Sequence, residues 1–122
     1  MDFPPDVREL QRAVCVRHGV TASPPHPSEK IGIALGTLSL RPLNGLRHPP
    51  EAGTCGWYVW GGEQFSTTDD FFQPLHVAHL HQTCSEVLPF LALPPGWRFL
   101  VDGGYEDAWY DETLLGPGNH SG

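Results

Sequence analysis

Three histidines lie within six residues, at positions 76, 79 and 81 of the stretch HVAHLH. Three imidazole nitrogens that converge on one point bind zinc or iron. On a helix, where each residue turns by about 100°, His76 and His79 share a face and His81 points away from both. On a strand, His79 and His81 share a face and His76 lies opposite. Because neither geometry unites the three rings and the HExxH pattern is absent, we predict solvated or hydrogen-bonded histidines, without a metal or other cofactor.

Carboxylates are the second group of residues that could take part in chemistry. Ten of the 14 acidic residues lie between positions 51 and 122. Two carboxylates at a suitable separation act as acid and base in glycoside hydrolysis. The candidates for such a pair are Glu63, Asp102, Glu106 and Asp107. A segment this acidic brings some carboxylates together by chance, and the sequence shows no GxSxG or cysteine-protease signature. We therefore predict a protein that is not an enzyme, with a small carboxylate-dependent hydrolase as the alternative.

Four tryptophans and three tyrosines exceed what a domain of 122 residues readily buries. Most are expected in the core. Tyr105, Trp109 and Tyr110 are flanked by acids and are typical of the aromatic anchors of protein interfaces. We expect at least one of the seven rings to contact a partner.

The charge is distributed unevenly along the chain. Residues 1–50 hold six basic and four acidic residues, a net charge of plus two, whereas residues 51–122 hold one basic and ten acidic residues, a net charge of minus nine. This balance disfavours nucleic-acid binding and permits a protein partner with a basic surface. The residues predicted to bind that partner are Glu63, Asp69, Asp70, Tyr105, Glu106, Asp107, Trp109 and Asp111.

Apolar spacing predicts a helix from residue 5 or 6 to residue 18 and helical segments over 75–84 and 85–93. Strands are predicted over 31–40, with a bulge at Gly36, and over 57–60, 97–104 and 106–112. Asn44 and Gly45 are typical of a turn, here in a long loop over 41–56. Asp69 or Asp70 is expected to cap the segment that follows.

The strand GWYVWGG carries bulky groups on both faces. Such a strand is covered on both sides, or covered on one side and used for recognition on the other. A ligand-binding regulatory domain built around Trp57 and Trp60 is therefore a further alternative.

The chain contains no apolar run long enough to span a membrane and no secretory signal, so we predict a cytoplasmic protein without a membrane partner. Its three cysteines are far apart and form no CxxC, which argues against disulfides and a cysteine-based zinc site. We predict one domain over residues 1–122, with flexible segments at 20–30 and 113–122. The expected fold is α+β, a small antiparallel sheet with helices packed on one face.

Three stretches together, GWYVWGGEQFSTTDDFF, LHVAHLHQTCSEVLPFLALPPGWRFL and DGGYEDAWYDE, resemble bacterial immunity protein family thirty-three of polymorphic toxin systems. The resemblance covers about residues 55–112. It implies a small α+β domain that is made in the cytosol beside a secreted or contact-delivered toxin and neutralises that toxin by binding it. It assigns no toxin contact to a named residue.

Overall fold

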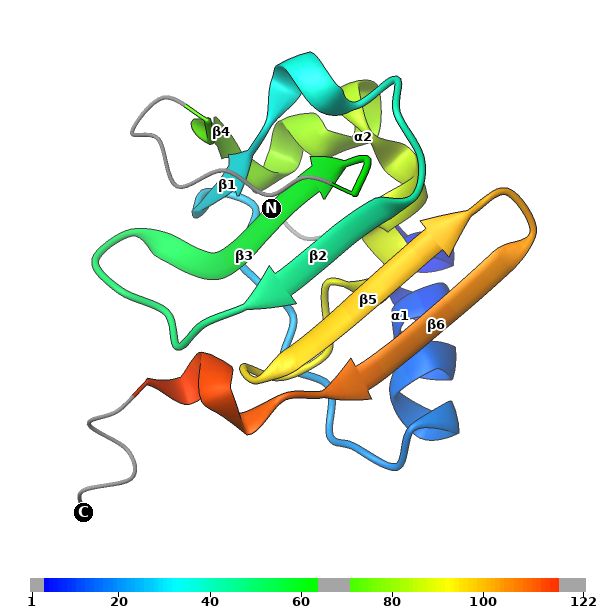
Figure 1. Cartoon of the computed structure of the whole chain (residues 1–122). Helices are drawn as coiled ribbons and strands as arrows, with labels where there is room; N and C mark the ends of the chain where they lie inside the picture. The colour runs from blue at the N-terminus through cyan, green and yellow to red at the C-terminus, as the bar shows by residue number, and fades with distance from the viewer. Residues whose placement is uncertain (1–3, 64–70, 117–122) are drawn as a thin grey trace.

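A computed structural model describes residues 4–63 and 71–116, and within these ranges six strands form one sheet in the order β4-β1-β3-β2-β5-β6 (Figure 1). The strands are β1 (Lys30–Ile33), β2 (Leu43–Arg47), β3 (Thr54–Gly61), β4 (Gln73–His76), β5 (Trp97–Asp102) and β6 (Tyr105–Tyr110). The α+β class is therefore confirmed. The prediction of a purely antiparallel sheet is wrong at one pair, because β1 and β3 run parallel and the other neighbours run antiparallel. The cause is β2, which lies between β1 and β3 in the sequence and runs antiparallel to β3, so that β3 has the same direction as β1.

The helical segments are α1 (Pro5–Arg17), η1 (Leu35–Thr37), η2 (Val77–His79), α2 (Leu80–Thr83), η3 (Ser85–Phe90) and η4 (Glu112–Leu115). The predicted N-terminal helix is confirmed in α1, where proline occupies the first turn and Val7 and Val14 are buried. Leu10, which lies at helical spacing between these two valines, is 52% exposed. Gln11 is buried instead, and its side-chain amide donates to the carbonyl of Leu88 at 3.0 Å.

Asn44 and Gly45, predicted as a turn, lie in the middle of β2, so that prediction is wrong. The ring of Phe99 packs so closely over Gly45 that a Cβ there would collide with it. The Asn44 side chain donates to the carbonyls of Pro42 and Gly62 at 3.1 and 2.8 Å. Asn44 and Gly45, residue types that are common in turns, therefore stabilise the packing of β2 against its neighbours.

The predicted strand over 31–40 is correct only up to Ile33, and the bulge lies between Lys30 and Gly32 rather than at Gly36. Beyond Ile33 the chain turns into η1, where the Thr37 hydroxyl donates to the carbonyl of Ala34 at 2.7 Å. That hydroxyl also accepts from the amide of Gly61 at 2.8 Å. These bonds stabilise a turn at the end of the sheet in place of a longer strand.

The large core cluster lies on the sheet face that α1, α2 and η3 cover, seen behind the sheet in Figure 1. Phe99 stacks on Phe90 with 4.9 Å between ring centroids, and the Trp57 indole donates to the carbonyl of Leu91 at 2.9 Å. Arg47 is buried in the same region. Its guanidinium donates to the carbonyls of Ser23, Cys55, Leu91 and Leu93.

A smaller cluster covers part of the opposite face. It contains Leu46, Trp60 and Leu114, with Tyr58 and Phe72 packed against it. Leu114 belongs to η4, so a helical segment also packs on this second face. The expectation that helices pack on one face only is therefore not confirmed. Strand β3 is thus covered on both sides, because Trp57 and Val59 face the large cluster and Trp60 faces the small one.

Candidate functional site

The β5–β6 hairpin carries most of the predicted partner-binding residues on the described part of the chain. A two-residue turn joins the strands, with Gly103 at a φ of 60°, a backbone conformation that glycine adopts without strain. The register sets Arg98 opposite Trp109 and Leu100 opposite Asp107. Because side chains alternate along a strand, they separate into two faces.

One face of β6 belongs to the core, since Ala108 is part of the large cluster. Residues 105, 107 and 109 therefore point to the other face, together with residues 98, 100 and 102 of β5. We call this group, with the residue that follows β6, the open-face site: Arg98, Leu100, Asp102, Tyr105, Asp107, Trp109 and Asp111. Tyr105 is 59% exposed and Trp109 is 38% exposed, so both rings are accessible.

Arg98 contacts two other residues of the open-face site, Trp109 and Asp111. Its guanidinium carbon lies 5.7 Å from the centroid of the Trp109 ring, and Nη1 donates to Oδ2 of Asp111 at 3.2 Å. A hydrogen bond from the Thr113 hydroxyl, with further contributions from the Thr113 amide and Arg98, keeps the pKa of Asp111 below its ordinary value. Asp111 therefore stays ionised, compensates the charge of Arg98 and positions that side chain over the indole.

Asp102 and Asp107 supply the remaining negative charge of the open-face site. Within the described residues neither is in an ion pair. Oδ1 of Asp107 accepts a hydrogen bond from the backbone N–H of Ala108 at 2.9 Å. Since Arg98 is compensated by Asp111, the site has a negative balance.

The other predicted partner-binding residues are placed differently. Glu106 points to the opposite face of β6 and forms an ion pair with Arg17 at 3.6 Å, so it is separated from the open-face site. Glu63 is exposed just beyond β3, at the end of the sheet that also holds the β5–β6 turn. Asp69 and Asp70 lie outside the described residues.

The predicted partner-binding residues did not include Arg98, Leu100 or Asp102, which was considered only as a catalytic carboxylate. The signal that identifies them is the turn at Gly103 and Gly104, because a two-residue turn fixes which residues of the two strands face each other. Tyr110, also proposed as an anchor, points to the helix side, where its ring meets Trp97 at a centroid distance of 6.1 Å.

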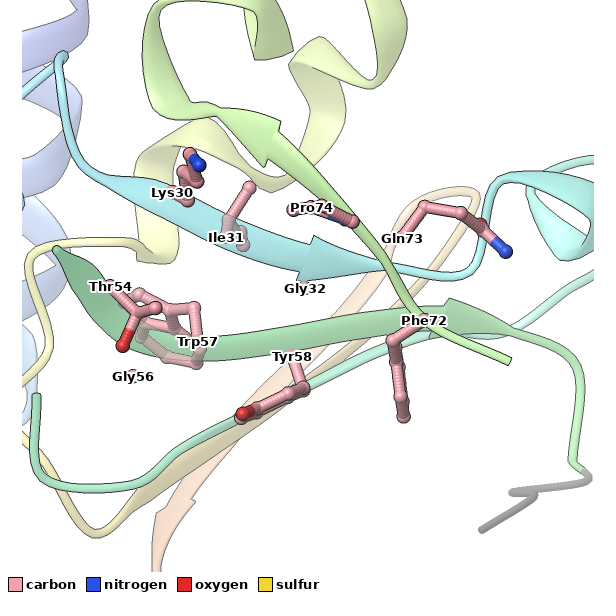
Figure 2. Close-up of a pocket in the computed structure, with 10 residues that line it drawn as sticks. All are labelled: Lys30, Ile31, Gly32, Thr54, Gly56, Trp57, Tyr58, Phe72, Gln73 and Pro74. Carbon is pink, nitrogen blue, oxygen red and sulfur yellow. The ribbon is translucent and has the colours of Figure 1, made fainter. Parts of the chain in front are cut away.

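Three open pockets on the described part of the chain bear on the enzyme and ligand-binding alternatives. Figure 2 shows one of about 200 Å³ beside Tyr58 and Phe72, lined by no carboxylate. A neighbouring pocket of about 260 Å³ includes Glu51, and one of about 330 Å³ beside α1 includes Glu9. None of the three brings two carboxylates together, and none favours an acid–base pair. Trp57 is buried in the large cluster and Trp60 in the small one, on opposite faces of the sheet, and Trp57 also lines the pocket in Figure 2.

The histidine-rich stretch is split between β4 and the helical turn after it. The rings of His76 and His79 approach edge to face with 5.8 Å between centroids. Over residues 4–63 and 71–116 no three His, Cys, Asp or Glu side chains gather as metal ligands would. Cys15, Cys55 and Cys84 are buried, and burial raises the pKa of each thiol.

No helix within the described ranges is long and apolar enough to cross a membrane.

In comparisons with known proteins, a family model described as an Imm33-like domain matches residues 10–111. The match begins well before the stretch over which the sequence motifs are visible, and it includes all six strands and the whole open-face site. Neither the curated proteins nor the solved structures gave a significant match.

Proposed function

This chain belongs to the Imm33-like family, and from that premise we propose that it is a cytosolic immunity protein that binds and neutralises a cognate bacterial toxin. The observation that carries the proposal is the extent of the family match, residues 10–111 of 122. The family name denotes immunity proteins, whose task is to protect the producing cell from a toxin. The proposed docking surface is the open-face site, with Glu63, Asp69 and Asp70 as further acidic contacts.

Aromatic anchors support this choice of surface. Large rings that are exposed before binding and buried after it contribute much of the free energy of a protein interface. Trp109 is partly exposed, and Arg98 and Asp111 already hold its surroundings in place. A ring ordered before binding loses little conformational entropy when the partner arrives.

Charge supports the same surface and describes the partner. The chain has a formal net charge of minus seven, and two of its carboxylates, those of Asp102 and Asp107, lie beside the rings and form no ion pair with another described residue. Complementary potentials speed encounter with a cationic surface and suppress binding to acidic proteins. We therefore propose a toxin whose contact surface is basic.

Neutralisation requires only that the bound chain cover the toxin's active site or its substrate path. A stable complex of ordinary size buries roughly 1,200 to 2,000 Å² in total. The open-face site would supply the centre of such an interface, and Glu63, at the same end of the sheet as the β5–β6 turn, would supply part of its rim.

The test combines capture with rescue. The tagged chain is used to isolate partners from its native host, and each captured protein is then expressed in a second bacterium. We expect one of them to arrest growth and the co-expressed chain to restore it. If every captured protein is harmless, or if the toxic one stays toxic in the presence of the chain, the proposed function is contradicted.

A further inference from the structure

Strand β6 is one edge of the sheet, and its second side has no neighbouring strand in the described part of the chain (Figure 1). The amide of Asp111 donates to the carbonyl of Gly96 at 2.6 Å, so these two opposite residues form a hydrogen-bonded pair. In an antiparallel ladder every second pair is hydrogen-bonded, so the backbone N–H and C=O groups of residues 105, 107 and 109 also point toward β5. Those of Glu106, Ala108 and Tyr110 point outward from the sheet.

This edge has an unusual composition for an unpaired strand. Among the described residues, the most exposed Phe, Trp and Tyr side chains are Tyr105, Trp109 and Tyr110, and all three lie on β6. Exposed edges with large apolar residues tend to pair with other chains, and natural proteins protect them with charges. The charges on this edge are Glu106 and Asp107, both negative.

Asp107 blocks the middle of the edge. Its carboxylate accepts the hydrogen bond of the outward Ala108 N–H, so this donor is occupied before any partner arrives. A cation brought close to Asp107 would compete for the carboxylate and release the N–H. Without a cation, the carboxylate and its charge oppose pairing with an unselected strand.

We propose that the cognate toxin adds an extended segment to β6 as a seventh strand, and that this segment carries lysine or arginine positioned against Asp107. The inference rests on the proposed function and specifies how the toxin is held. Outward N–H and C=O groups of Glu106, Ala108 and Tyr110 supply the ladder, and Tyr105 and Trp109 pack against the added strand's side chains. A second copy of this chain is disfavoured in the register centred on Asp107, because the two carboxylates would face each other directly.

Two substitutions at one position separate strand addition from charge attraction. Glu106→Pro removes an outward N–H that the fold does not use, and its ring obstructs an added strand, while the β5 ladder is retained. Glu106→Gln removes the same charge and keeps the N–H. Both lose the ion pair with Arg17, which is half exposed and contributes little to stability.

The probe is an end-capped peptide of alternating lysine and valine, titrated into isotope-labelled protein by NMR. We expect the amide signals of Glu106, Ala108 and Tyr110 to shift and to gain protection from exchange in the unsubstituted protein. Glu106→Gln should weaken binding by a few-fold at most and Glu106→Pro by about tenfold or more, the effect of losing a hydrogen bond together with steric obstruction. An otherwise identical peptide with glutamate in place of lysine should not bind.

Equal binding by Glu106→Pro and Glu106→Gln, or no peptide-dependent change on β6, would overturn strand addition. The growth-rescue assay separates this failure from failure of the proposed function. If Glu106→Pro still protects cells from the toxin as well as the unsubstituted chain does, the function stands and the strand-addition inference is wrong. If the unsubstituted chain gives no protection, the proposed function itself is wrong and the inference falls with it.

Discussion

The guanidinium of Arg98 lies over the indole of Trp109, 5.7 Å from the ring centroid, and the two residues face each other across the β5–β6 ladder. The same guanidinium forms an ion pair with Asp111, so its positive charge is compensated and the surface keeps a net negative charge. The arrangement offers a cationic partner an ordered aromatic anchor beside Asp107. This relationship is the basis of the docking surface that we propose.

Asp107→Asn should slow association with the toxin, because the substitution removes an uncompensated charge beside the anchors. We expect the association rate to fall by a factor of about 1.4 to 5 at low salt, which matches the roughly 0.2 to 1 kcal/mol of exposed charge pairs. Stopped-flow kinetics at two salt concentrations measures it. Glu9→Gln on α1 is the matched control and should leave the rate unchanged; equal rates for both variants would exclude Asp107 from steering.

Asp111 should make the stability of the fold depend on pH in the acid range. Its folded-state pKa is lowered, so the carboxylate stabilises the fold above the unfolded-state pKa of about 3.9. This contribution disappears as pH falls through the folded-state pKa. Asp111→Asn should therefore lose less stability than the unsubstituted protein between about pH 5 and pH 2, as urea titrations at each pH would show. Parallel stability curves for the two proteins would contradict this assignment.

Arg47→Met should destabilise the fold strongly although the new side chain is of similar length. The substitution removes the donor of two buried carbonyls, those of Cys55 and Leu93, and of the partly buried carbonyl of Ser23. We expect the free energy of unfolding to fall by about 2 to 5 kcal/mol. Denaturant titration measures the change, with exposed Arg12→Met as the control; comparable losses in both variants would show that the buried network is not responsible.

Gly45→Ala tests the close packing of β2 against β5. A Cβ at this position would displace the Phe99 ring, which stacks on Phe90, and overpacking of this kind costs about 1 to 3 kcal/mol. Gly36→Ala is the matched control, because a Cβ there meets no atom within 4 Å. Thermal unfolding should show a lower midpoint for the first variant only. A Gly45→Ala protein as stable as the control would mean that the Phe99 ring has room to move.

Local sequence patterns predicted α1, β3, β5 and β6: apolar spacing indicates α1, aromatic and β-branched residues indicate β3 and β5, and the glycine pair before β6 indicates a hairpin. They failed at β2, where tertiary contact overrides local preference: Asn44 and Gly45 favour a turn, but the Phe99 ring requires glycine in a central strand. They also missed β4, which contains Pro74 at an edge, a position where a strand tolerates proline.

The candidate site was predictable in part for a similar reason. The composition of β6 identified Tyr105, Asp107 and Trp109, because acids beside aromatic residues are visible in a single segment. Glu106 was grouped with them although alternation along a strand sends it to the other face, where it meets Arg17. The role of Arg98 depends on cross-strand register, which becomes definite only once the turn geometry is fixed.

Docking of the toxin on the open-face site is tested most directly by the affinity of the Trp109→Ala variant for the toxin identified by capture and growth rescue. Isothermal titration calorimetry would compare this variant with Leu10→Ala, which removes an exposed apolar side chain from α1. We expect Trp109→Ala to raise Kd by about thirtyfold, or roughly 2 kcal/mol, and Leu10→Ala to leave Kd unchanged. A Trp109→Ala protein that folds normally and binds the toxin as tightly as the unsubstituted chain would contradict docking on the open-face site.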